Sequence, residues 1–398
     1  MLALQGCRRQ LPRHPLKLTA RFSEARDLFR ASLIPTGRLQ KFVTGTPFVF
    51  PHRTSKIADM SESKSFLSGC KGLSLTADEK AFFRNERPWG FILFGRNIGE
   101  PAQVADLTAE MRDCIGGNAD IPVLIDQEGG RVQRIKPPHV QQYPNAAALG
   151  AIHRADQEKG LRAAWLMSRL HAFDLFRLGV NVDCLPVLDV AVPGVHDVIG
   201  NRAYGQEPEI VSVMGKAAGE GLKAGGLLPI MKHIPGHGRT MVDSHHDLPV
   251  VHASREELEA CDFVPFRHMK DELMAMSAHI VFTAIDADNP ATTSAKVVRE
   301  IIRDHIGFDG LLMSDDVSMN ALKGDIAARS RGIIAAGLDM VLHCHGIMDE
   351  MIAVTENVPP LAGDSLRRAN AVRAGFPTPD GADEQALREE FNAMIAVA

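Results

Sequence analysis

The feature that most constrains the fold is a repeated pattern of short apolar runs, each followed by a stretch with the period of an amphipathic helix. Eight such runs lie at residues 66–70, 90–94, 121–125, 180–190, 227–233, 273–282, 310–316 and 340–343. Buried strands that alternate with helices predict an α/β protein with a parallel sheet, and the number eight favours a closed (β/α)₈ TIM-type barrel. The alternative is an open doubly wound sheet, but no GxGxxG or Walker motif supports a nucleotide site there.

Helical patterns fill the intervals between these runs. Thr76 and Glu79 have the spacing of a capping box and predict the start of a short helix. The other predicted helices cover residues 101–115, 156–178, 208–223, 297–305, 326–336 and, with interruptions, 347–398. We therefore expect one barrel domain over residues 60–364, followed by a helical C-terminal tail over residues 365–398.

Residues 1–59 differ from the rest of the chain. They hold eleven Lys or Arg against three acidic residues, a local balance of +8, and five prolines without a sustained apolar period. A secretory signal is not predicted because there is no long apolar core; an Arg-rich transit peptide is the alternative. We expect a disordered extension, or translated sequence upstream of the true start at Met60.

Composition narrows the class of protein. The chain has 398 residues, 45% of them hydrophobic and 23% charged, with a net charge of −5. This balance does not favour nucleic acid as a partner, and no apolar run reaches the length of a membrane span. The six cysteines form no CxxC pair, which is typical of reduced thiols in a cytoplasmic protein. Oligomeric state is left open.

Polar side chains collect at the ends of the predicted strands. They are Asp126, Asp189, Lys232, His233, His279, Asp315 and His343. In a barrel, the carboxyl ends of the strands meet at one mouth, where enzymes of this architecture hold their chemistry. Capping of the following helices is the plain alternative, but capping does not call for Lys or His. We therefore expect an active site at this mouth.

The loop after the fifth strand is the richest in titratable groups. Lys232-His-Ile-Pro-Gly-His-Gly238 is followed by Asp243-Ser-His-His246. One reading is a metal-dependent hydrolase that uses His233, His237 and His245. The Pro235-Gly236 break argues against it, because a His-x3-His pair serves as a ligand pair when both lie on one helix face.

The second reading is glycoside hydrolysis. A retaining glycosidase needs a carboxylate nucleophile and an acid/base group. Asp315 at a strand end suits the nucleophile, and since side chains alternate along a strand, only one of Asp315 and Asp316 should face the mouth. His245, oriented by Asp243, suits the acid/base. Charge-assisted hydrogen bonds to a sugar would then come from Asp126, Arg134, Arg202, Lys232 and His233. A third reading, a binding protein on a barrel, would not need so many titratable groups.

Five motifs occur in order between about Met60 and Gly346: 126-DQEGGRVQR-134, 199-IGNR-202, 232-KHIPGHG-238, 243-DSH-245 and 314-SDDVSM-319. With these motifs the chain resembles the bacterial β-N-acetylglucosaminidases of glycoside hydrolase family 3, the single-domain cytosolic enzymes of peptidoglycan recycling. The resemblance implies a (β/α)₈ barrel and the release of terminal N-acetylglucosamine from muropeptides that end in 1,6-anhydro-N-acetylmuramic acid. It implies no metal or organic cofactor.

Residue by residue, the resemblance makes Asp315 the nucleophile, His245 the acid/base and Asp243 its orienting partner. It makes Asp126, Arg134, Arg202, Lys232 and His233 the ligands of the terminal sugar. His246 directly follows His245, so the sequence leaves open which imidazole acts. Some relatives transfer the glycosyl group to phosphate, so a glycoside phosphorylase is a further alternative.

Overall fold

The structure, a computed structural model, describes residues 62–118, 120–194, 199–240 and 248–396. All of them fall in the unit Phe50–Ala398 of the chain. The predicted extension at residues 1–59 lies outside the described residues, and so do Asp243, His245 and His246.

A parallel sheet forms the centre of the molecule. Its strand segments are β1 (Lys64–Ser68), β2 (Pro88–Leu93), β3 (Val123–Ile125), β6 (Val182–Asp183), β7 (Leu228–Pro229), β8 (Met231–Ile234), β10 (Met274–Ser277), β12 (Leu311–Asp316) and β13 (Met340–His343). They pair in the order β7-β6-β3-β2-β1-β13-β12-β10-β8, and every pair is parallel. The segments at the two ends of this order, β7 and β8, are separated in the chain only by Ile230.

The sheet therefore closes on itself. β7 pairs with β6 on one side, and its continuation β8 pairs with β10 on the other. Counting β7 and β8 as one strand, the barrel has eight strands, which confirms the predicted (β/α)₈ architecture over the open sheet. Because both faces of a parallel barrel are covered, the strands are apolar along most of their length, as the sequence runs indicated.

Two predicted strands are shorter than their apolar runs. Of residues 180–190, only β6 is regular, because Pro186 has no N–H to donate to a ladder. The carbonyl of Pro186 still accepts a hydrogen bond of 3.1 Å from the Lys232 N–H, so this segment continues beside β8. The run 273–282 divides into β10 and β11 (Val281–Phe282), and β11 leaves the barrel to pair with β9 (Val250–Val251).

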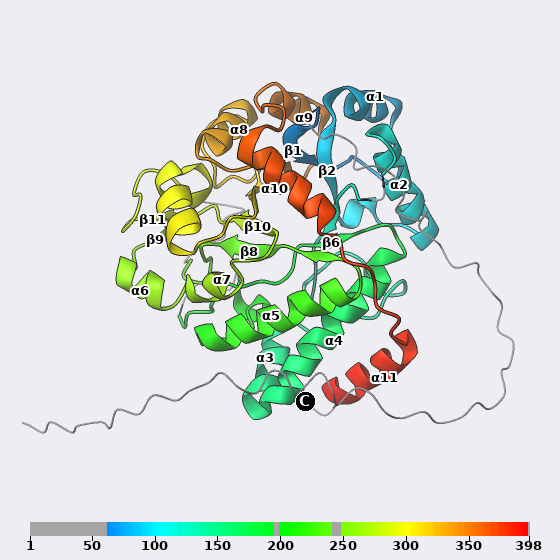
Figure 1. Ribbon diagram of the computed structural model, residues 1–398, viewed down its shortest axis with the longest axis vertical. Helices are drawn as coiled ribbons and strands as arrows, with labels where there is room; N and C mark the ends of the chain where they lie inside the picture. Colours follow the sequence, from blue (N-terminus) through cyan, green and yellow to red (C-terminus); the bar gives the residue numbers. More distant parts are fainter. Residues whose placement is uncertain (1–61, 119, 195–198, 241–247, 397–398) are drawn as a thin grey trace, which may run out of the picture. The chain divides into compact units, whose positions relative to one another are not determined.

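Helices surround the barrel (Figure 1). They are α1 (Ala77–Glu86), α2 (Pro101–Cys114), α3 (Ala146–Ala155), α4 (Gln157–Phe176), α5 (Pro208–Ala224), α6 (Arg255–Ala260), α7 (Val264–His268), the π-helical segment η5 (Val297–His305), α8 (Ile326–Ala335), α9 (Met348–Thr355), α10 (Gly363–Ala374) and α11 (Glu384–Ile395). The predicted capping box opens α1: Thr76 Oγ1 accepts from the Glu79 N–H, and Glu79 Oε2 accepts from the Thr76 N–H. The sequence patterns did not predict α3, α6 and α7.

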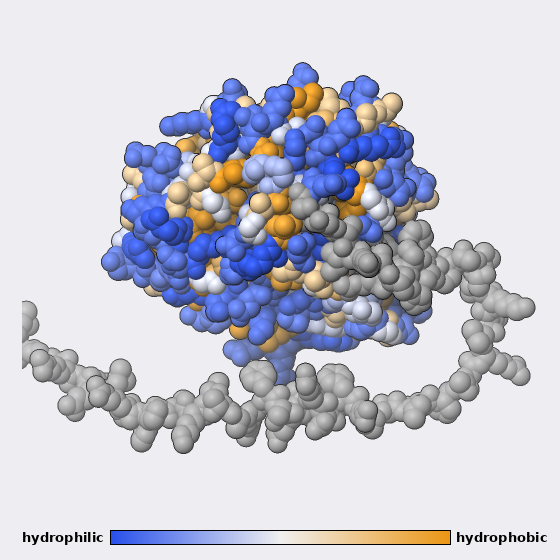
Figure 2. Space-filling view, turned by 45° about the horizontal axis from the view of Figure 1, so that its top comes forward, coloured by the Kyte–Doolittle hydropathy of each residue, from blue (hydrophilic) through white to orange (hydrophobic). Residues whose placement is uncertain are grey.

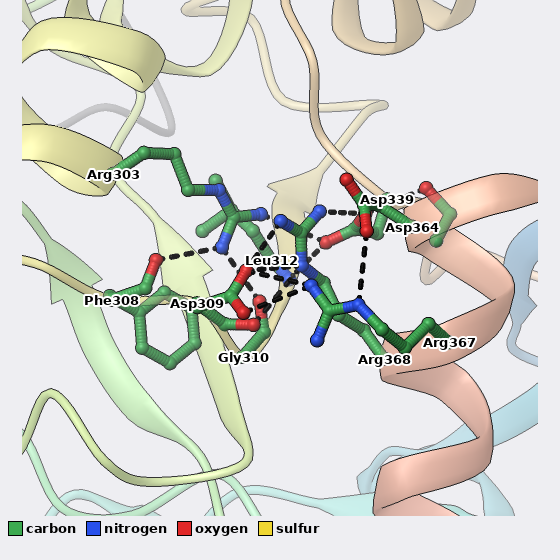
Figure 3. Close-up of polar contacts among 10 residues, drawn as sticks. Arg303, Phe308, Asp309, Gly310, Leu312, Asp339, Asp364, Arg367 and Arg368 are labelled. Carbon is green, nitrogen blue, oxygen red and sulfur yellow. Dashed lines mark hydrogen bonds and ion pairs between the residues drawn. The ribbon is translucent and has the colours of Figure 1, made fainter.

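Helix α10 closes the amino end of the barrel. Its residues Ala369 and Val372 belong to one apolar cluster with residues at the starts of strands, among them Trp89, Met274 and Leu311. In Figure 1 the helix crosses the strands, and Figure 3 shows its polar attachment.

The attachment joins α10 to the two turns that precede β12 and β13. Arg368 donates to Asp309 Oδ1 at 2.7 Å and to Asp339 Oδ1 at 3.1 Å. Arg303 of η5 reaches the other oxygen of Asp339 at 3.0 Å. Asp339 is 1% exposed, so its charge depends on these arginines. Helix α10 thus covers the amino end of the barrel, opposite the carboxyl ends of the strands.

The surface carries both hydrophobic and hydrophilic side chains. Figure 2 shows hydrophobic side chains in small patches between hydrophilic ones on the face that it displays. Within the described part of the chain, no helix combines the length and the apolar character needed to cross a membrane.

Candidate active site

A cavity of about 140 Å³ opens among the carboxyl ends of the strands. Of the polar residues predicted at the mouth, Asp189, His279 and His343 are not in its lining. The lining does include every described residue with a predicted catalytic or sugar-binding role: Asp126, Arg134, Arg202, Lys232, His233 and Asp315. The strands bring these residues together from positions up to 189 apart in the sequence. The predicted acid/base His245 and its partner Asp243 lie outside the described residues, so their assignment stays a prediction.

Lys232 is the centre of an ionic network on one wall of the cavity. This side chain, only 2% exposed, places its ammonium 2.8 Å from Asp126 Oδ1 and 2.6 Å from Glu128 Oε1. Arg134 donates to the second oxygen of Asp126 at 2.8 Å. Arg202 holds Glu128 through two parallel bonds of 2.7 and 2.8 Å. Such bidentate pairing fixes the carboxylate plane.

The network keeps both carboxylates ionised. Burial alone would raise the pKa of Asp126, but the charges of Lys232 and Arg134 outweigh it and leave the pKa well below its usual range. Burial likewise opposes ionisation of Glu128, yet Arg202 and Lys232 lower its pKa to about 2. The pKa of Lys232 is raised because the attraction of both carboxylates exceeds the effect of its burial. These groups therefore carry fixed charges at any physiological pH.

Glu128 has no role predicted from the sequence. It lies in the motif 126-DQEGGR-131, on the short strand β4 (Gln127–Gly129), which forms a hairpin with β5 (Val132–Gln133). Its position after a predicted strand was a usable signal. Its partner Arg202 is 74 residues away, and only the folded barrel shows the pairing.

A second buried carboxylate, Asp189, orients the Lys232–Gly238 loop. Its Oδ2 lies 2.7 Å from His233 Nδ1, and its Oδ1 accepts from the backbone N–H groups of His233 at 3.1 Å and His237 at 2.7 Å. Burial would raise the pKa of Asp189, but the adjacent His233 and His237 lower it. Because an ionised Asp189 accepts the hydrogen on Nδ1, the opposite ring nitrogen of His233 is available on the side of the cavity.

Asp315 lies in β12 at the cavity wall. Burial would raise the pKa of Asp315, but the charges of His279, His233 and Lys232, together with the Asp316 N–H at 2.8 Å, lower it overall. The carboxylate is therefore ionised at neutral pH, as a nucleophile requires.

Asp316 has a different role from its neighbour. Both residues are in the cavity lining. The Asp316 carboxylate, however, accepts from Ser318 Oγ at 2.6 Å and from the N–H groups of Ser318 and Cys344. It is fixed to the turn that follows β12, whereas the Asp315 carboxylate is not.

His279 supports β12 from the neighbouring loop. Its Nε2 lies 3.0 Å from the Asp316 carbonyl, so this nitrogen is the donor, and its Nδ1 lies 2.8 Å from Thr292 Oγ1. Burial lowers the pKa of His279, and the Thr292 hydroxyl beside Nδ1 donates to the Ala278 carbonyl at 3.0 Å. Thr292 in turn lies 2.7 Å from Ser277 Oγ. His279 therefore holds the strand that carries Asp315.

The metal alternative involves His233, His237 and the undescribed His245. The rings of His233 and His237 have centroids 5.4 Å apart, and burial with the charge of His233 lowers the pKa of His237 to about 4. Across residues 62–118, 120–194, 199–240 and 248–396, no group of three or more His, Cys, Asp or Glu is placed to hold a metal ion. Since His245 is outside these ranges, a metal site that includes it is still an alternative.

Comparison with known proteins identifies the family. Residues 55–366 match the glycosyl hydrolase family 3 N terminal domain. A beta-hexosaminidase of Bordetella avium is 34% identical over 303 residues, which cover 75% of this chain and 85% of the relative. NagZ from Neisseria gonorrhoeae, solved in complex with N-trifluoroacetyl-D-glucosamine, is 31% identical with a TM-score of 0.73 and covers 84% of this chain and 97% of its own. The same Neisseria protein has been solved with a zinc ion, with 30% identity, a TM-score of 0.72 and the same coverage.

The match spans the barrel and all the described site residues, at an identity and coverage that exceed a likeness of fold alone. The resemblance stated from the five motifs is confirmed: this chain belongs to glycosyl hydrolase family 3.

Proposed function

We propose that this chain is a retaining β-N-acetylhexosaminidase that releases terminal β-linked N-acetylglucosamine, with Asp315 as the nucleophile. The observation that carries the proposal is an ionised carboxylate at the cavity wall, held in a strand of the barrel and beside a wall of paired charges. The names of the relatives from Bordetella and Neisseria support the same class of substrate.

The ionic network around Lys232 on the cavity wall is suited to bind a neutral sugar. A hydroxyl group both donates and accepts, so a wall with carboxylates and cations side by side can satisfy it in both directions. Among the described lining residues, the three cations Arg134, Arg202 and Lys232 face four carboxylates, Asp126, Glu128, Asp315 and Asp316. There is no excess of positive charge to attract a free phosphate ion, which favours hydrolysis over phosphorolysis.

The reaction takes two displacements. In the first, an Asp315 oxygen bonds to the anomeric carbon while the bond from that carbon to the aglycone oxygen breaks, and His245 donates a proton to this oxygen. In the second, His245 removes a proton from water as the water oxygen bonds to the anomeric carbon and releases Asp315 as a carboxylate. Two inversions retain the β configuration. The assignment of His245, with Asp243 as its orienting group, rests on the resemblance.

The resemblance also carries the biological part of the proposal. We infer that the natural aglycone is a 1,6-anhydro-N-acetylmuramic acid peptide and that the enzyme works in the cytoplasm in peptidoglycan recycling. A direct test is to incubate the purified protein with anhydro-muropeptides and to identify free N-acetylglucosamine by mass spectrometry.

Three assays test the reaction class. The p-nitrophenyl β-N-acetylglucosaminide should be cleaved, whereas the matched β-glucoside should be a poor substrate. Addition of phosphate should yield no sugar 1-phosphate; its formation would favour the phosphorylase. Prolonged treatment with EDTA should leave the rate unchanged, and a loss of rate that zinc restores would favour the metal hydrolase.

A covalent trap tests Asp315 itself. A 5-fluoro N-acetylglucosaminyl fluoride should slow the second displacement and leave the sugar on the peptide that contains Asp315. The Asp315→Asn variant should fold, bind N-acetylglucosamine and show no labelling. Label on another carboxylate, or normal turnover of Asp315→Asn, would contradict the proposed nucleophile.

A further inference from the structure

The C-terminal helix α11 lies outside the part of the chain that matches the family, residues 55–366, yet it is firmly attached to the barrel domain. It packs along α4, as Figure 1 shows. Arg162 of α4 makes two bonds of 2.7 Å to Glu390, and Arg177 at the end of α4 binds Glu384. These contacts are on the outside of the molecule. One residue of α11 reaches further inward.

Arg388 enters the interior beside Tyr143 and Asp174. It forms an ion pair with Asp174 Oδ1 and donates to the Tyr143 hydroxyl at 3.1 Å. Tyr143 in turn donates to Asp174 Oδ2 at 2.5 Å. Tyr143 is 1% exposed and Asp174 is 5% exposed, so the two groups depend on Arg388 for the charge that balances the carboxylate.

Tyr143 is hydrogen-bonded to the β4–β5 hairpin through its backbone. Its carbonyl accepts from the Gly130 N–H at 3.0 Å, and its N–H donates to Gln133 Oε1 at 3.0 Å. Its ring packs edge-on against His171, with 4.4 Å between the centroids, and His171 Nδ1 lies 3.5 Å from Asp183 Oδ2. The position of Tyr143 therefore sets the position of the hairpin.

The proposed sugar-binding residues Asp126, Glu128 and Arg134 lie in this hairpin or next to it. Gln127, between Asp126 and Glu128, donates its N–H to Asp183 Oδ1 at 3.0 Å and accepts the Arg134 N–H on its side-chain oxygen at 3.0 Å. A shift of this hairpin would move two carboxylates and Arg134 together. Small misplacements in a binding site have large effects on rate, on the order of 100-fold for 1 Å.

We propose that Arg388 is a positioning residue for the terminal-sugar subsite: through Asp174 and Tyr143 it fixes the β4–β5 hairpin and so the groups Asp126, Glu128 and Arg134. The C-terminal helix is then part of the binding apparatus of this enzyme. The inference rests on the proposed function in taking that wall to be the sugar subsite.

The test compares Arg388→Ala with Arg162→Ala. Each variant removes one arginine that ties α4 to α11, but Arg162 is directed to Glu390 and has no route to the hairpin. The measured quantities are kcat, KM and the inhibition constant of N-acetylglucosamine, which reports the sugar subsite without any reaction. We expect Arg388→Ala to raise KM and the inhibition constant by about tenfold or more, and Arg162→Ala to leave both unchanged although its thermal midpoint falls.

Two further variants keep the test decisive if Arg388→Ala does not fold. Arg388→Lys keeps the positive charge but cannot bridge Asp174 and Tyr143. Its affinity for N-acetylglucosamine should therefore lie between those of Arg388→Ala and the unmodified protein. Tyr143→Phe keeps the ring and removes the hydroxyl, so it should copy the effect of Arg388→Lys. In the double variant with Arg388→Ala, Tyr143→Phe should raise KM and the inhibition constant little further, since both changes break the same connection.

The outcomes separate the two proposals. If Asp126→Asn weakens inhibition by N-acetylglucosamine but Arg388→Ala, Arg388→Lys and Tyr143→Phe do not, the positioning role is wrong and the sugar subsite stands. If Asp126→Asn itself has no effect, the assignment of the subsite is wrong. If the thermal midpoint of Arg388→Ala falls while its inhibition constant matches that of Arg162→Ala, Arg388 has only a structural role.

Discussion

At the scale of single residues, the site is built from pairs that are far apart in the sequence. Glu128 with Arg202 and Asp189 with His233 are 74 and 44 positions apart. Each pair fixes both members, because a buried charge without its partner is strongly disfavoured. The charges of the wall therefore depend on each pair staying intact. Acidification, which protonates the carboxylates, should break the pairs and lower the stability of the fold.

The first prediction concerns Glu128. Its pKa is about 2 in the folded protein, below its ordinary value, because Arg202 and Lys232 outweigh burial. A carboxylate with a lowered pKa contributes stability above the unfolded pKa of about 4.3. That contribution, on the order of 3 kcal/mol, is lost as the pH falls from about 4.3 toward 2. The thermal midpoint, measured across this window, should fall less steeply in Glu128→Gln than in the unmodified protein.

A matched control is Glu356→Gln, which changes an exposed carboxylate at the end of α9. Its midpoint should follow that of the unmodified protein at every pH. Equal slopes for all three proteins would mean that the Arg202 and Lys232 pairing does not lower the pKa of Glu128.

A second prediction at this scale identifies the acid/base group. His245→Ala should reduce cleavage of a nitrophenyl glycoside only mildly, because nitrophenolate leaves with little protonation. It should reduce cleavage of a disaccharide by about 10²–10⁴-fold, because a sugar alkoxide needs the proton. Asp243→Ala should give a weaker copy of this pattern, and His246→Ala should have little effect. The reverse behaviour of the two histidines would assign the role to His246.

The sequence could identify the cavity residues at strand ends because a parallel barrel gathers all its carboxyl ends at one mouth. Asp126, Lys232 and Asp315 follow from that rule alone. It could not identify Glu128 or Tyr143 as functional, or give Asp189 more than a place at the mouth, because their roles come from partners that only the closed barrel brings near. Tyr143 lies between predicted elements, where no periodic pattern assigns a direction to its side chain.

At the scale of secondary-structure elements, the sequence predicts the features that residues close together in the chain determine. The capping residues of α1 and the long apolar face of α4 are legible in the sequence. Pro186 signals that the strand that begins with β6 is interrupted. The departure of β11 from the barrel is not legible, because it depends on which neighbouring strand offers hydrogen bonds. Helix α10 was likewise predicted only as part of a tail, and its role in covering the barrel comes from tertiary packing.

The prediction for this element compares two adjacent arginines on α10. Arg368 is 12% exposed and pairs with Asp339, which is 1% exposed, whereas Arg367 is 52% exposed and pairs with exposed partners. Arg368→Ala should lower the free energy of unfolding by about 1–3 kcal/mol, and Arg367→Ala by less than about 1 kcal/mol. Urea denaturation measures both. Equal effects would show that the buried Asp339 is adequately balanced by Arg303 alone.

At the scale of the whole molecule, the family match and the described elements begin close to Met60. We therefore expect the barrel to work without residues 1–59. A chain that begins at Met60 should keep its kcat, its KM and its thermal midpoint, measured beside the full-length protein. Loss of folding on truncation would show that the N-terminal residues contribute to the stability of the barrel.

The packed interior of the barrel, which α10 covers at the amino end, has a consequence for how a polymer could be degraded. Side chains fill a closed parallel barrel, so it is not a pore, and whatever enters past the carboxyl ends of the strands has to leave the same way. A glycan therefore cannot slide through, and each encounter should clip one unit from a chain terminus. In the proposed double displacement the aglycone leaves first and the clipped sugar last, so accumulated sugar should itself slow the next round.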